Sequence, residues 1–491
     1  MRNFPFITNS GSISIDEVPV LSHADFKKAI TNAVEDGARV SAMFACPMHN
    51  ELRLFAVIAC VPMGQIGIVS AIHSEQAVSL TPDCPQVHLF EREMAERYGI
   101  TFHGHPWLKP VRFPAAGTHP PAKMDYFRIQ GDEIHEVAVG PVHAGIIEPG
   151  HFRFQCHGET VHHLEISLGY QHRGVENALT GKLDQRKIRI VETIAGDTSV
   201  GHATGFCSAV EALCRTDVPA RAQVLRVVAL ELERIANHLG DLGALAGDVG
   251  FLPVMSFCGR IRGEVLNITA QMCGNRFGRG LVCPGGLSQN IDQETALFMH
   301  RNLKTVLKDA EEAVGLLFET PSVLSRFQGT GIVSSSLASE TGLVGPAARA
   351  SGIESDVRSD FPSGFYRMAH IPVSMWDSGD VFSRALVKWM EVQRSVAFAL
   401  EQLSGLPGGE ILCPPGQLPA DGMSVSLTET WRGEACHIII TDKRGELKQC
   451  RIVDPSFHNW FGLACAMRGQ QISDFPLCNK SFNLSYCGHD L

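Results

Sequence analysis

The fold of the longer part of the chain is decided by the stretch Ala220-Arg-Ala-Gln-Val-Leu-Arg-Val-Val-Ala-Leu-Glu-Leu-Glu-Arg-Ile-Ala-Asn-His-Leu-Gly-Asp-Leu242. Apolar residues recur there every three or four positions, which places them on one face of a helix. They are Val224, Val227, Val228, Leu232, Ile235, Leu239 and Leu242. The pattern predicts a helix over 220–247 that packs on a core. Similar patterns predict helices over 184–213, 293–318 and 380–404, and Asp292 stands where the third of the four helices needs an N-cap.

Strand patterns lie on both sides of these helices. Short β-branched runs predict strands near 136–142, 152–156, 160–166, 435–441 and 447–453. The first part of the chain alternates helix-like runs at 25–38 and 87–98 with strand-like runs around 40–46, 52–61 and 66–72. We therefore predict an α+β fold with an α/β domain over 1–113, a Pro- and Gly-rich linker over 114–135, and a mainly helical domain with small β segments over 136–491.

Composition excludes several classes of protein. The 42 basic and 52 acidic residues give a net charge of −10, which argues against a nucleic-acid partner. The 15 cysteines include no CxxC pair, so the chain offers no pattern for a zinc ribbon or an iron–sulfur cluster of its own. The N-terminus has no signal-peptide pattern, and the longest apolar run, 54–63, is too short to cross a bilayer. We expect a cytoplasmic protein with reduced thiols.

Generic motifs leave the function open. The crowding of His143, His151, His157, His162 and His163 allows a metal site, but a polar strand pair facing a partner or a cleft is the interpretation that the spacing favours. The segment 329–331 is read as a loop turn rather than as part of a dinucleotide loop. The charged block 231–238 predicts a solvated or ion-paired helix face.

Longer motifs carry a family resemblance. Residues 91–106, Glu-Arg-Glu-Met-Ala-Glu-Arg-Tyr-Gly-Ile-Thr-Phe-His-Gly-His-Pro, resemble the signature of the small hydrophilic, 30-kDa-type subunit of respiratory complex I. The segments 140–143, 148–153 and 171–176 resemble the opening of a group 4 [NiFe]-hydrogenase large subunit and of its relative, the quinone-site subunit of complex I. Further matches follow in order at 231–238, 274–276, 284–286, 329–331, 345–346, 349–352, 356–358, 432–434, 472–477 and 481–486. The fused arrangement resembles formate hydrogenlyase-type large subunits.

The resemblance also identifies where this chain departs from the hydrogenases. A [NiFe] centre needs four thiolates, because soft anionic sulfur holds nickel and bridges iron. The family supplies them as two CxxC pairs, whose positions here are Ala195, Thr198, Ser485 and Gly488, with Cys487 adjacent but out of register. We therefore expect no bound metal and no hydrogen turnover. The chain ends where the family's last motif ends, and we expect no tail of the kind that is clipped after nickel insertion.

The quinone contacts of complex I are altered as well. The resemblance places the quinone-binding tyrosine at Gly196 and the histidine at Ile147 or Glu148. Glu148, His151 and Asp197 remain as candidates for a proton relay. Other residues predicted to line the cavity are His143, His172, Arg173, Glu176, Ala195, Gly196, Thr198, Ser485 and Cys487. The alternative is that the charged members are interface ion pairs kept for assembly.

These matches imply a subunit of a membrane-bound, complex I-like or hydrogenase-related oxidoreductase that couples electron transfer to proton or ion translocation. Its partners would be an iron–sulfur small subunit, which supplies the electrons, and antiporter-like membrane subunits, which hold it at the inner face of the cytoplasmic membrane. We expect no cofactor bound by this chain alone, although a quinone is possible. Two alternatives stay open: a non-catalytic scaffold subunit of the same complex, and a quinone reductase of the NADH-quinone oxidoreductase type with altered head-group contacts.

Overall fold

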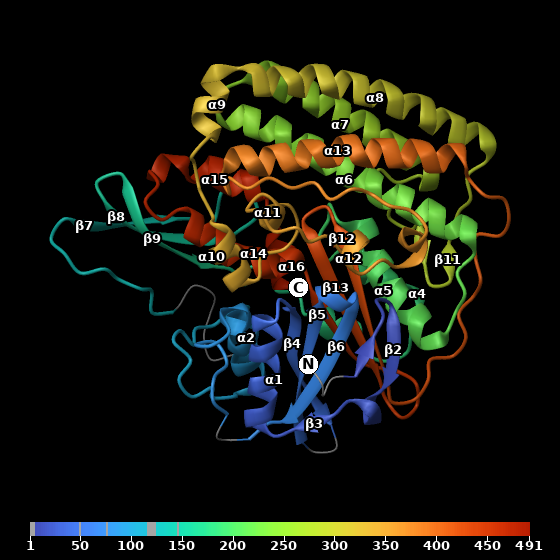
Figure 1. Cartoon of the computed structure of the whole chain (residues 1–491), viewed down its shortest axis with the longest axis horizontal. Helices are drawn as coiled ribbons and strands as arrows, with labels where there is room; N and C mark the ends of the chain where they lie inside the picture. Colours follow the sequence, from blue (N-terminus) through green and yellow to red (C-terminus); the bar gives the residue numbers. More distant parts are fainter. Residues whose placement is uncertain (1–4, 49–50, 75–76, 115–123, 145–146) are drawn as a thin grey trace.

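The computed structural model describes residues 5–48, 51–74, 77–114, 124–144 and 147–491. It contains helical layers and several small, mostly antiparallel sheets, which confirms the α+β prediction. In Figure 1 the first part of the chain lies below, the long helices lie above, and a sheet of mostly C-terminal strands lies between them.

The first part of the chain forms a sheet with two helices against it. Its strands are ordered β1–β6–β5–β4, with β3 paired to β6. The strands are β1 (Phe6–Ile7), β3 (Val20–Leu21), β4 (Arg39–Met48), β5 (Glu51–Cys60) and β6 (Gln65–Ile72). Helix α1 (His23–Glu35) is capped by Ser22, and α2 (His88–Tyr98) ends at Gly99, whose φ of +69° suits glycine. The helices and strands predicted here are confirmed.

A second sheet joins the two parts of the chain. Its order is β14–β13–β12–β2, so that β2 (Gly11–Ser14) pairs with β12 (Gly422–Thr430), beside β13 (Gly433–Thr441) and β14 (Leu447–Val453). Every residue of β12 and β13 is buried. The hydrophobic core of the first part continues into Met423, Val425 and Leu427 of β12. The sheet β14–β13–β12–β2 is therefore covered on both faces.

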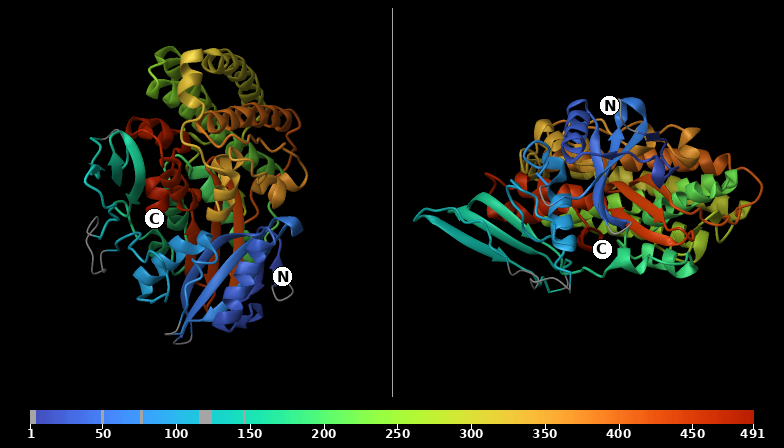
Figure 2. Two further views of the ribbon diagram at one scale, coloured as in Figure 1. Left: turned by 60° about the vertical axis from the view of Figure 1, so that its left-hand side comes forward. Right: turned by 90° about the horizontal axis from the view of Figure 1, so that it is seen from below.

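Long helices form a layer above this sheet in Figure 1, and α5 (Ser199–Cys214) packs on β12 and β13 below them. The long helices are α6 (Ala220–Asp248), α7 (Leu252–Cys273), α8 (Gln293–Glu319) and α13 (Val381–Ser404), which lie side by side in Figures 1 and 2. The predicted apolar stripe of α6 is buried, and Asp292 caps α8 by accepting a 2.7 Å hydrogen bond from the Thr295 amide. Helix α7 was missed by the periodicity analysis. Among the described residues, none of the helices combines the length and the apolar character that a membrane crossing requires.

The prediction of one helix over 184–213 is wrong. The structure has α4 (Gln185–Val191) and α5 (Ser199–Cys214), separated by a turn at 192–198. Gly196, Asp197 and Thr198 favour turns over helix interiors, because their backbones or short polar side chains stabilise other conformations. The apolar periodicity runs across the turn and concealed it.

A three-stranded antiparallel sheet extends from the body of the molecule. It consists of β7 (Ile134–Val139), β8 (His151–His157) and β9 (Thr160–Ser167), as predicted, and both Figure 1 and Figure 2 show it projecting to one side.

The segment 329–331 is a turn, also as predicted. The remaining elements are α3 (Val175–Ala178), α9 (Pro321–Phe327), α10 (Ser335–Thr341), α11 (Gly345–Arg349), α12 (Val357–Asp360), α14 (Pro455–Ala466), α15 (Phe475–Phe482), α16 (Tyr486–Asp490), β10 (Val282–Cys283), β11 (Gly286–Leu287) and the 3₁₀ helices η1 (Ile15–Glu17), η2 (Val61–Met63), η3 (Pro85–Val87), η4 (Gly364–Arg367) and η5 (Ile472–Asp474).

Candidate functional site

Two loops that are far apart in the sequence meet at the candidate site. They are the turn at 192–198 and the segment around 483–488. The Arg173 guanidinium donates to the backbone oxygens of Thr193 (2.6 Å) and Ile194 (3.0 Å) in the first loop and of Cys487 (3.2 Å) in the second. The structure thus brings these two loops together through Arg173.

An ion pair occupies the centre of this junction. Arg432 Nη1 and Nη2 each donate to one oxygen of the Asp197 carboxylate at 2.7 Å, and Nη1 also reaches Thr198 Oγ1 at 3.2 Å. The same guanidinium donates through Nε to the Asn483 carbonyl, so it joins both loops. Burial opposes ionisation of Asp197, but Arg432 outweighs it and lowers the pKa of the carboxyl. Asp197, which neither relative explains, is the partner of an arginine that the sequence analysis did not place in the site.

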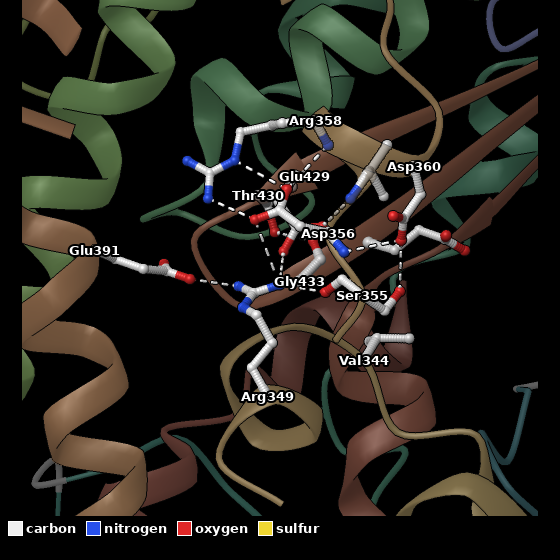
Figure 3. A network of polar contacts seen from close by, with 12 residues as sticks. Val344, Arg349, Ser355, Asp356, Arg358, Asp360, Glu391, Glu429, Thr430 and Gly433 are labelled. Atoms are coloured by element: carbon white, nitrogen blue, oxygen red, sulfur yellow. Dashed lines mark hydrogen bonds and ion pairs between the residues drawn. The ribbon is translucent and has the colours of Figure 1, made fainter. Parts of the chain in front are cut away.

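The turn that carries Arg432 is held by a buried polar network (Figure 3). Arg234 donates to the carbonyl oxygens of Glu429 (2.7 Å) and Thr430 (3.1 Å), at the end of β12. Arg349 pairs with the carboxylates of Glu429 (2.9 Å) and Glu391 (2.5 Å). Each of these side chains is at most 2% exposed, and so is Glu231, which pairs with Arg234 at 3.1 Å. The ion-paired interpretation of the block 231–238 is confirmed, and its solvated alternative is wrong.

Two glycines that lie very close to each other also help to position the turn that carries Arg432. Gly345 (φ +66°) and Gly433 (φ +126°) lie so near each other that a Cβ on Gly345 would stand 2.4 Å from the Gly433 Cα. Only glycine tolerates both the backbone angles and this contact. The motifs at 345–346 and 432–434 are thus two sides of one backbone contact beside Arg432.

Glu233 is a second carboxyl that the sequence analysis missed. Its oxygens accept hydrogen bonds from the amides of Val200 (2.8 Å) and Gly201 (3.1 Å), in the first turn of α5. Burial raises the pKa of Glu233 to about 8, with a contribution from the Asp197 charge and against the two amide donors. The only sequence signal for it was its place in a charged block. Its carboxyl is positioned to gain and lose a proton near neutral pH.

The four positions that correspond to the thiolate ligands of the hydrogenases carry no soft ligand here. Ala195 is buried, and Thr198 Oγ1 accepts hydrogen bonds from Trp431 and Arg432. Ser485 Oγ caps α16 by accepting the Gly488 amide at 2.9 Å. These donors do not fit a [NiFe] centre, because hydroxyl oxygens and a methyl group cannot replace thiolates as ligands of nickel. Within the described residues, His, Cys, Asp and Glu side chains form no group of three or more that could hold a metal ion.

The space in front of Gly488 is filled by another carboxylate. A Cβ on Gly488 would stand 2.6 Å from Cγ and 2.7 Å from Oδ2 of Asp454. Asp454 in turn accepts from His202 Nε2 at 3.0 Å, and His202 Nδ1 lies 3.1 Å from His437 Nε2. The three side chains of this hydrogen-bonded series are each at most 1% exposed. The sequence analysis did not find the series, because its members come from three separate elements.

Glu148 lies at the edge of the same junction. It accepts from the Tyr486 amide at 3.3 Å. Burial and the Glu148 charge raise the pKa of the Cys487 thiol to about 11, and Cys487 Sγ is 3.4 Å from Ser485 Oγ. Of the predicted residues, Glu148, Ser485 and Cys487 therefore form one group, next to the group of Asp197 and Thr198.

The predicted histidines are placed differently. His143 Nε2 contacts the Gly150 oxygen at 2.8 Å, and His151 Nδ1 contacts the Gly140 oxygen at 3.3 Å, both near the base of β8. Arg153 donates to His151 Nε2 at 3.0 Å, and burial lowers the pKa of His151, so this imidazole is neutral. His172 Nδ1 contacts the Asp490 carbonyl at 2.8 Å. These imidazoles contact backbone oxygens rather than one another.

Glu176 belongs to a junction between the two parts of the chain. It accepts from Arg97 on α2, and from Arg451 Nη1 and the Ile452 amide at 3.1 Å each. Arg451 also pairs with Glu93 of α2. Glu176 thus forms ion pairs within the chain, and these connect α2 to β14.

Comparison with known proteins agrees with this geometry. Residues 248–417 match the model of the 49-kDa subunit of respiratory-chain NADH dehydrogenase, and residues 27–130 match that of the 30-kDa subunit. The carbon monoxide-induced hydrogenase of Rhodospirillum rubrum is 30% identical over 350 residues, which cover 71% of this chain and 97% of that protein. The chain belongs to the family of group 4 hydrogenase large subunits and complex I 49-kDa subunits.

Other members of this family span much of the chain. Formate hydrogenlyase subunit 5 of Escherichia coli is 27% identical over 83% of this chain and 76% of its own length. NADH-quinone oxidoreductase subunit 4 of Thermus thermophilus is 28% identical over 70% of this chain and 90% of its own length. The chain is thus related both to hydrogenases and to complex I, and its N-terminal part adds the 30-kDa-type region.

Proposed function

We propose that this chain is the peripheral subunit of a membrane-bound, complex I-like oxidoreductase complex, that it forms no [NiFe] centre, and that it couples electron transfer to proton or ion translocation. Membership of the family supports the class of complex. The observation that carries the finer proposal is the Asp197–Arg432 ion pair, which lies between the two loops that supply thiolates in the hydrogenases.

The residues around this ion pair support a site for protons rather than for a metal. Both carboxylate oxygens of Asp197 already accept hydrogen bonds from Arg432, so this carboxylate is not free to bind a cation. Asp454 fills the space that a ligand at position 488 would need. Glu233, whose pKa is raised to about 8 by burial, stands within electrostatic reach of Asp197. A change of charge nearby would move a proton on or off Glu233, and this is the elementary step of coupling that the site can perform.

Glu148, His151 and Asp197 remain our candidates for the path that protons take. Glu148 lies beside Cys487 and the Tyr486 amide, and Asp197 lies beside Arg432. His151 is neutral and bonded to Arg153 and to a backbone oxygen, so it would act by releasing the proton on Nδ1 or by accepting one on Nε2 after Arg153 moves. In this proposal Glu148 and Asp197 accept a proton only in transit, Asp197 after its contact with Arg432 opens, and His151 positions the backbone at Gly140.

The partners follow from the family. Formate hydrogenlyase, membrane-bound hydrogenase and NADH-quinone oxidoreductase are assemblies of several subunits, so we propose an iron–sulfur small subunit and antiporter-like membrane subunits as partners here. We propose that these partners hold the chain at the inner face of the cytoplasmic membrane. We also propose that 1–113 and 136–491 correspond to the 30-kDa-type and large-subunit domains, joined by 114–135.

The test is the composition and activity of the whole complex. The tagged chain is purified from its host with its partners, and nickel, iron, acid-labile sulfide and bound quinone are measured beside hydrogen evolution from reduced viologen. We expect iron and sulfide from the partner, less than a tenth of one nickel per chain, and no hydrogen. One nickel per chain would overturn the proposal.

Variants distinguish the coupling proposal from the two alternatives, a non-catalytic scaffold and a quinone reductase. In proteoliposomes, Asp197→Asn should abolish proton or sodium translocation driven by electron transfer, whereas the surface variant Asp83→Asn should behave as the wild type. Unchanged coupling in both Asp197→Asn and Glu148→Gln would favour the scaffold. Quinone reduction by the wild type that is lost in Glu148→Gln would instead favour a quinone reductase, for which bound quinone is the independent readout.

A further inference from the structure

A cavity of about 540 Å³ lies along the part of α5 that follows the candidate site. Helix α5 begins at Ser199, beside Asp197, and its residues Thr204, Ser208, Glu211 and Ala212 line the cavity. The volume falls within the range of about 300–1,000 Å³ that is usual for small-molecule sites. None of the residues proposed for proton coupling lines it.

The inner walls of the cavity are rigid and electrically balanced. Arg226 donates both Nη atoms to Glu211 (3.0 and 2.6 Å) and further bonds to the oxygens of Cys283 and Gly286. Arg358 is held in the same way by Asp356 (2.9 and 2.6 Å) and by Glu231. Every guanidinium nitrogen of these two arginines makes at least one hydrogen bond within the protein, and their fixed positions make the cavity a preformed one.

Two other arginines of the lining differ in this respect. Arg215 and Arg367 are exposed. Among the described residues, the Arg367 guanidinium donates to two backbone oxygens, of Pro362 and Asn9, at 3.3 Å each. The side chain of Arg215 has no hydrogen bond or ion pair with another described residue. Against these two positive charges the mouth of the cavity offers one exposed carboxylate, Asp217.

Ser208 of α5 adds a polar side chain to the lining, and this residue is half-buried. Thr204 and Thr216 line the cavity as well, but their hydroxyl oxygens are buried away from it. Apolar surface from Phe365, and the exposed Met368 beside it, completes the wall formed by the segment 363–368.

We propose that this cavity binds a small polar molecule that carries an oxyanion, as a phosphate or a carboxylate group. The anion would lie between Arg215 and Arg367, because two guanidinium groups that lack carboxylate partners provide charge-assisted donors to its oxygens. The hydroxyl of Ser208 would bond to the polar body of the molecule. Arg226 and Arg358 would shape the cavity without contacting the anion.

The experiment measures anion binding to the purified complex by titration calorimetry at constant ionic strength. The probes are inorganic phosphate, pyrophosphate and citrate, so that phosphate and carboxylate chemistry are told apart. We expect saturable binding of at least one probe, at one site per chain. Arg215→Gln and Arg367→Gln should each weaken it by about tenfold, whereas Arg301→Gln, at an exposed position on α8, should leave it unchanged.

A blocking variant places the site inside the cavity rather than on the surface. Ser208 is a half-buried residue of α5 that lines the cavity, and Ser208→Leu should reduce binding of the probe while both arginines remain. The proposal is overturned if no probe binds saturably, if both arginine variants bind as the wild type does, if Arg301→Gln weakens binding equally, or if Ser208→Leu has no effect. None of these measurements depends on nickel content or ion translocation.

Discussion

Arg432 and Asp197 face each other through two parallel hydrogen bonds of 2.7 Å, between residues that are 235 positions apart in the chain. The arginine side chain is 5% exposed and the aspartate side chain 34%. This geometry is the strong, bidentate form of an arginine–carboxylate contact. It joins the turn before α5 to the β12–β13 turn, and Arg432 continues the connection to Asn483.

Removing the carboxylate should therefore destabilise the fold. Asp197→Ala leaves the Arg432 guanidinium nearly buried without its charged partner. We expect the free energy of unfolding to fall by about 1–3 kcal/mol, because water can enter beside the partly exposed position 197 and solvate the guanidinium. Asp83→Ala, which breaks an ion pair with Lys27 at the surface, should cost about 0–1 kcal/mol. Urea unfolding of the full-length chain measures both, and equal losses would contradict the geometry.

A side chain at position 488 should be harmful even when it is small. Gly488→Ala places a methyl group 2.6 Å from Asp454 Cγ, and we expect a loss of about 1–3 kcal/mol from overpacking. Gly259→Ala, in the interior of α7 with nothing within 4 Å, should instead stabilise the protein by up to about 1 kcal/mol. The comparison uses the same substitution in two helices. A stabilising Gly488→Ala would show that Asp454 does not block this position.

The protonation of Glu233 should appear in the pH dependence of stability. Its pKa is raised from 4.5 to about 8 in the folded protein, so between these values the native state holds a proton that the unfolded chain has released. Stability that is present below pH 4.5 is therefore lost as the pH rises to about 8. Unfolding free energies at pH 6 and pH 8.5 should differ less in Glu233→Gln than in the wild type. An unchanged difference would mean that Glu233 is ionised throughout.

The network around Arg349 should contribute strongly to stability. Arg349→Ala leaves the carboxylates of Glu391 and Glu429 buried without their partner, and we expect a loss of about 3–5 kcal/mol. Arg326→Ala removes a half-exposed pair with Asp474 and should cost about 0–1 kcal/mol. Chemical denaturation gives both values. A small loss for Arg349→Ala would show that water reaches these carboxylates.

The thiol of Cys487 should resist alkylation at neutral pH. Its pKa is raised to about 11 by burial and by the Glu148 charge, so the thiolate fraction at pH 7.5 lies about a hundredfold or more below that of an ordinary cysteine. Iodoacetamide labelling read by mass spectrometry should modify the exposed Cys413 first. Glu148→Gln should increase the rate at Cys487. Equal rates in the wild type and in Glu148→Gln would show that Glu148 does not influence the thiol of Cys487.

Local patterns predicted much of the fold. The helices α6, α8 and α13 and the strands β4, β5 and β6 follow from apolar periodicity, because each buries one face or a continuous apolar run. Helix α7 and strand β12 were missed. The sequence of β12, Gly-Met-Ser-Val-Ser-Leu-Thr-Glu-Thr, is half polar although every residue is buried. Ser426 and Glu429 contact Ser10 and Arg349, which are distant in the sequence, and local composition does not reveal such partners.

The candidate site, like the fold, could be predicted only in part from the sequence. The absence of cysteines at Ala195, Thr198, Ser485 and Gly488 is a property of the sequence, and so are the motifs that identify the family. Glu233 and Arg432 were not predicted as site residues, since each became important only through a neighbour more than 30 residues away. The same holds for the Asp454–His202–His437 chain.

The sequence by itself determined the α+β class, the positions of most helices and strands, the family, and the lack of thiolates, because each of these depends on residues close together in the chain. Only the tertiary structure decided that the helix predicted over 184–213 breaks before Ser199, that β2 completes a sheet with β12, and that Arg432, Asp454 and Glu233 converge beside Asp197. The physical reason is that burial and pairing of charges are set by contacts between distant segments, which no local pattern contains.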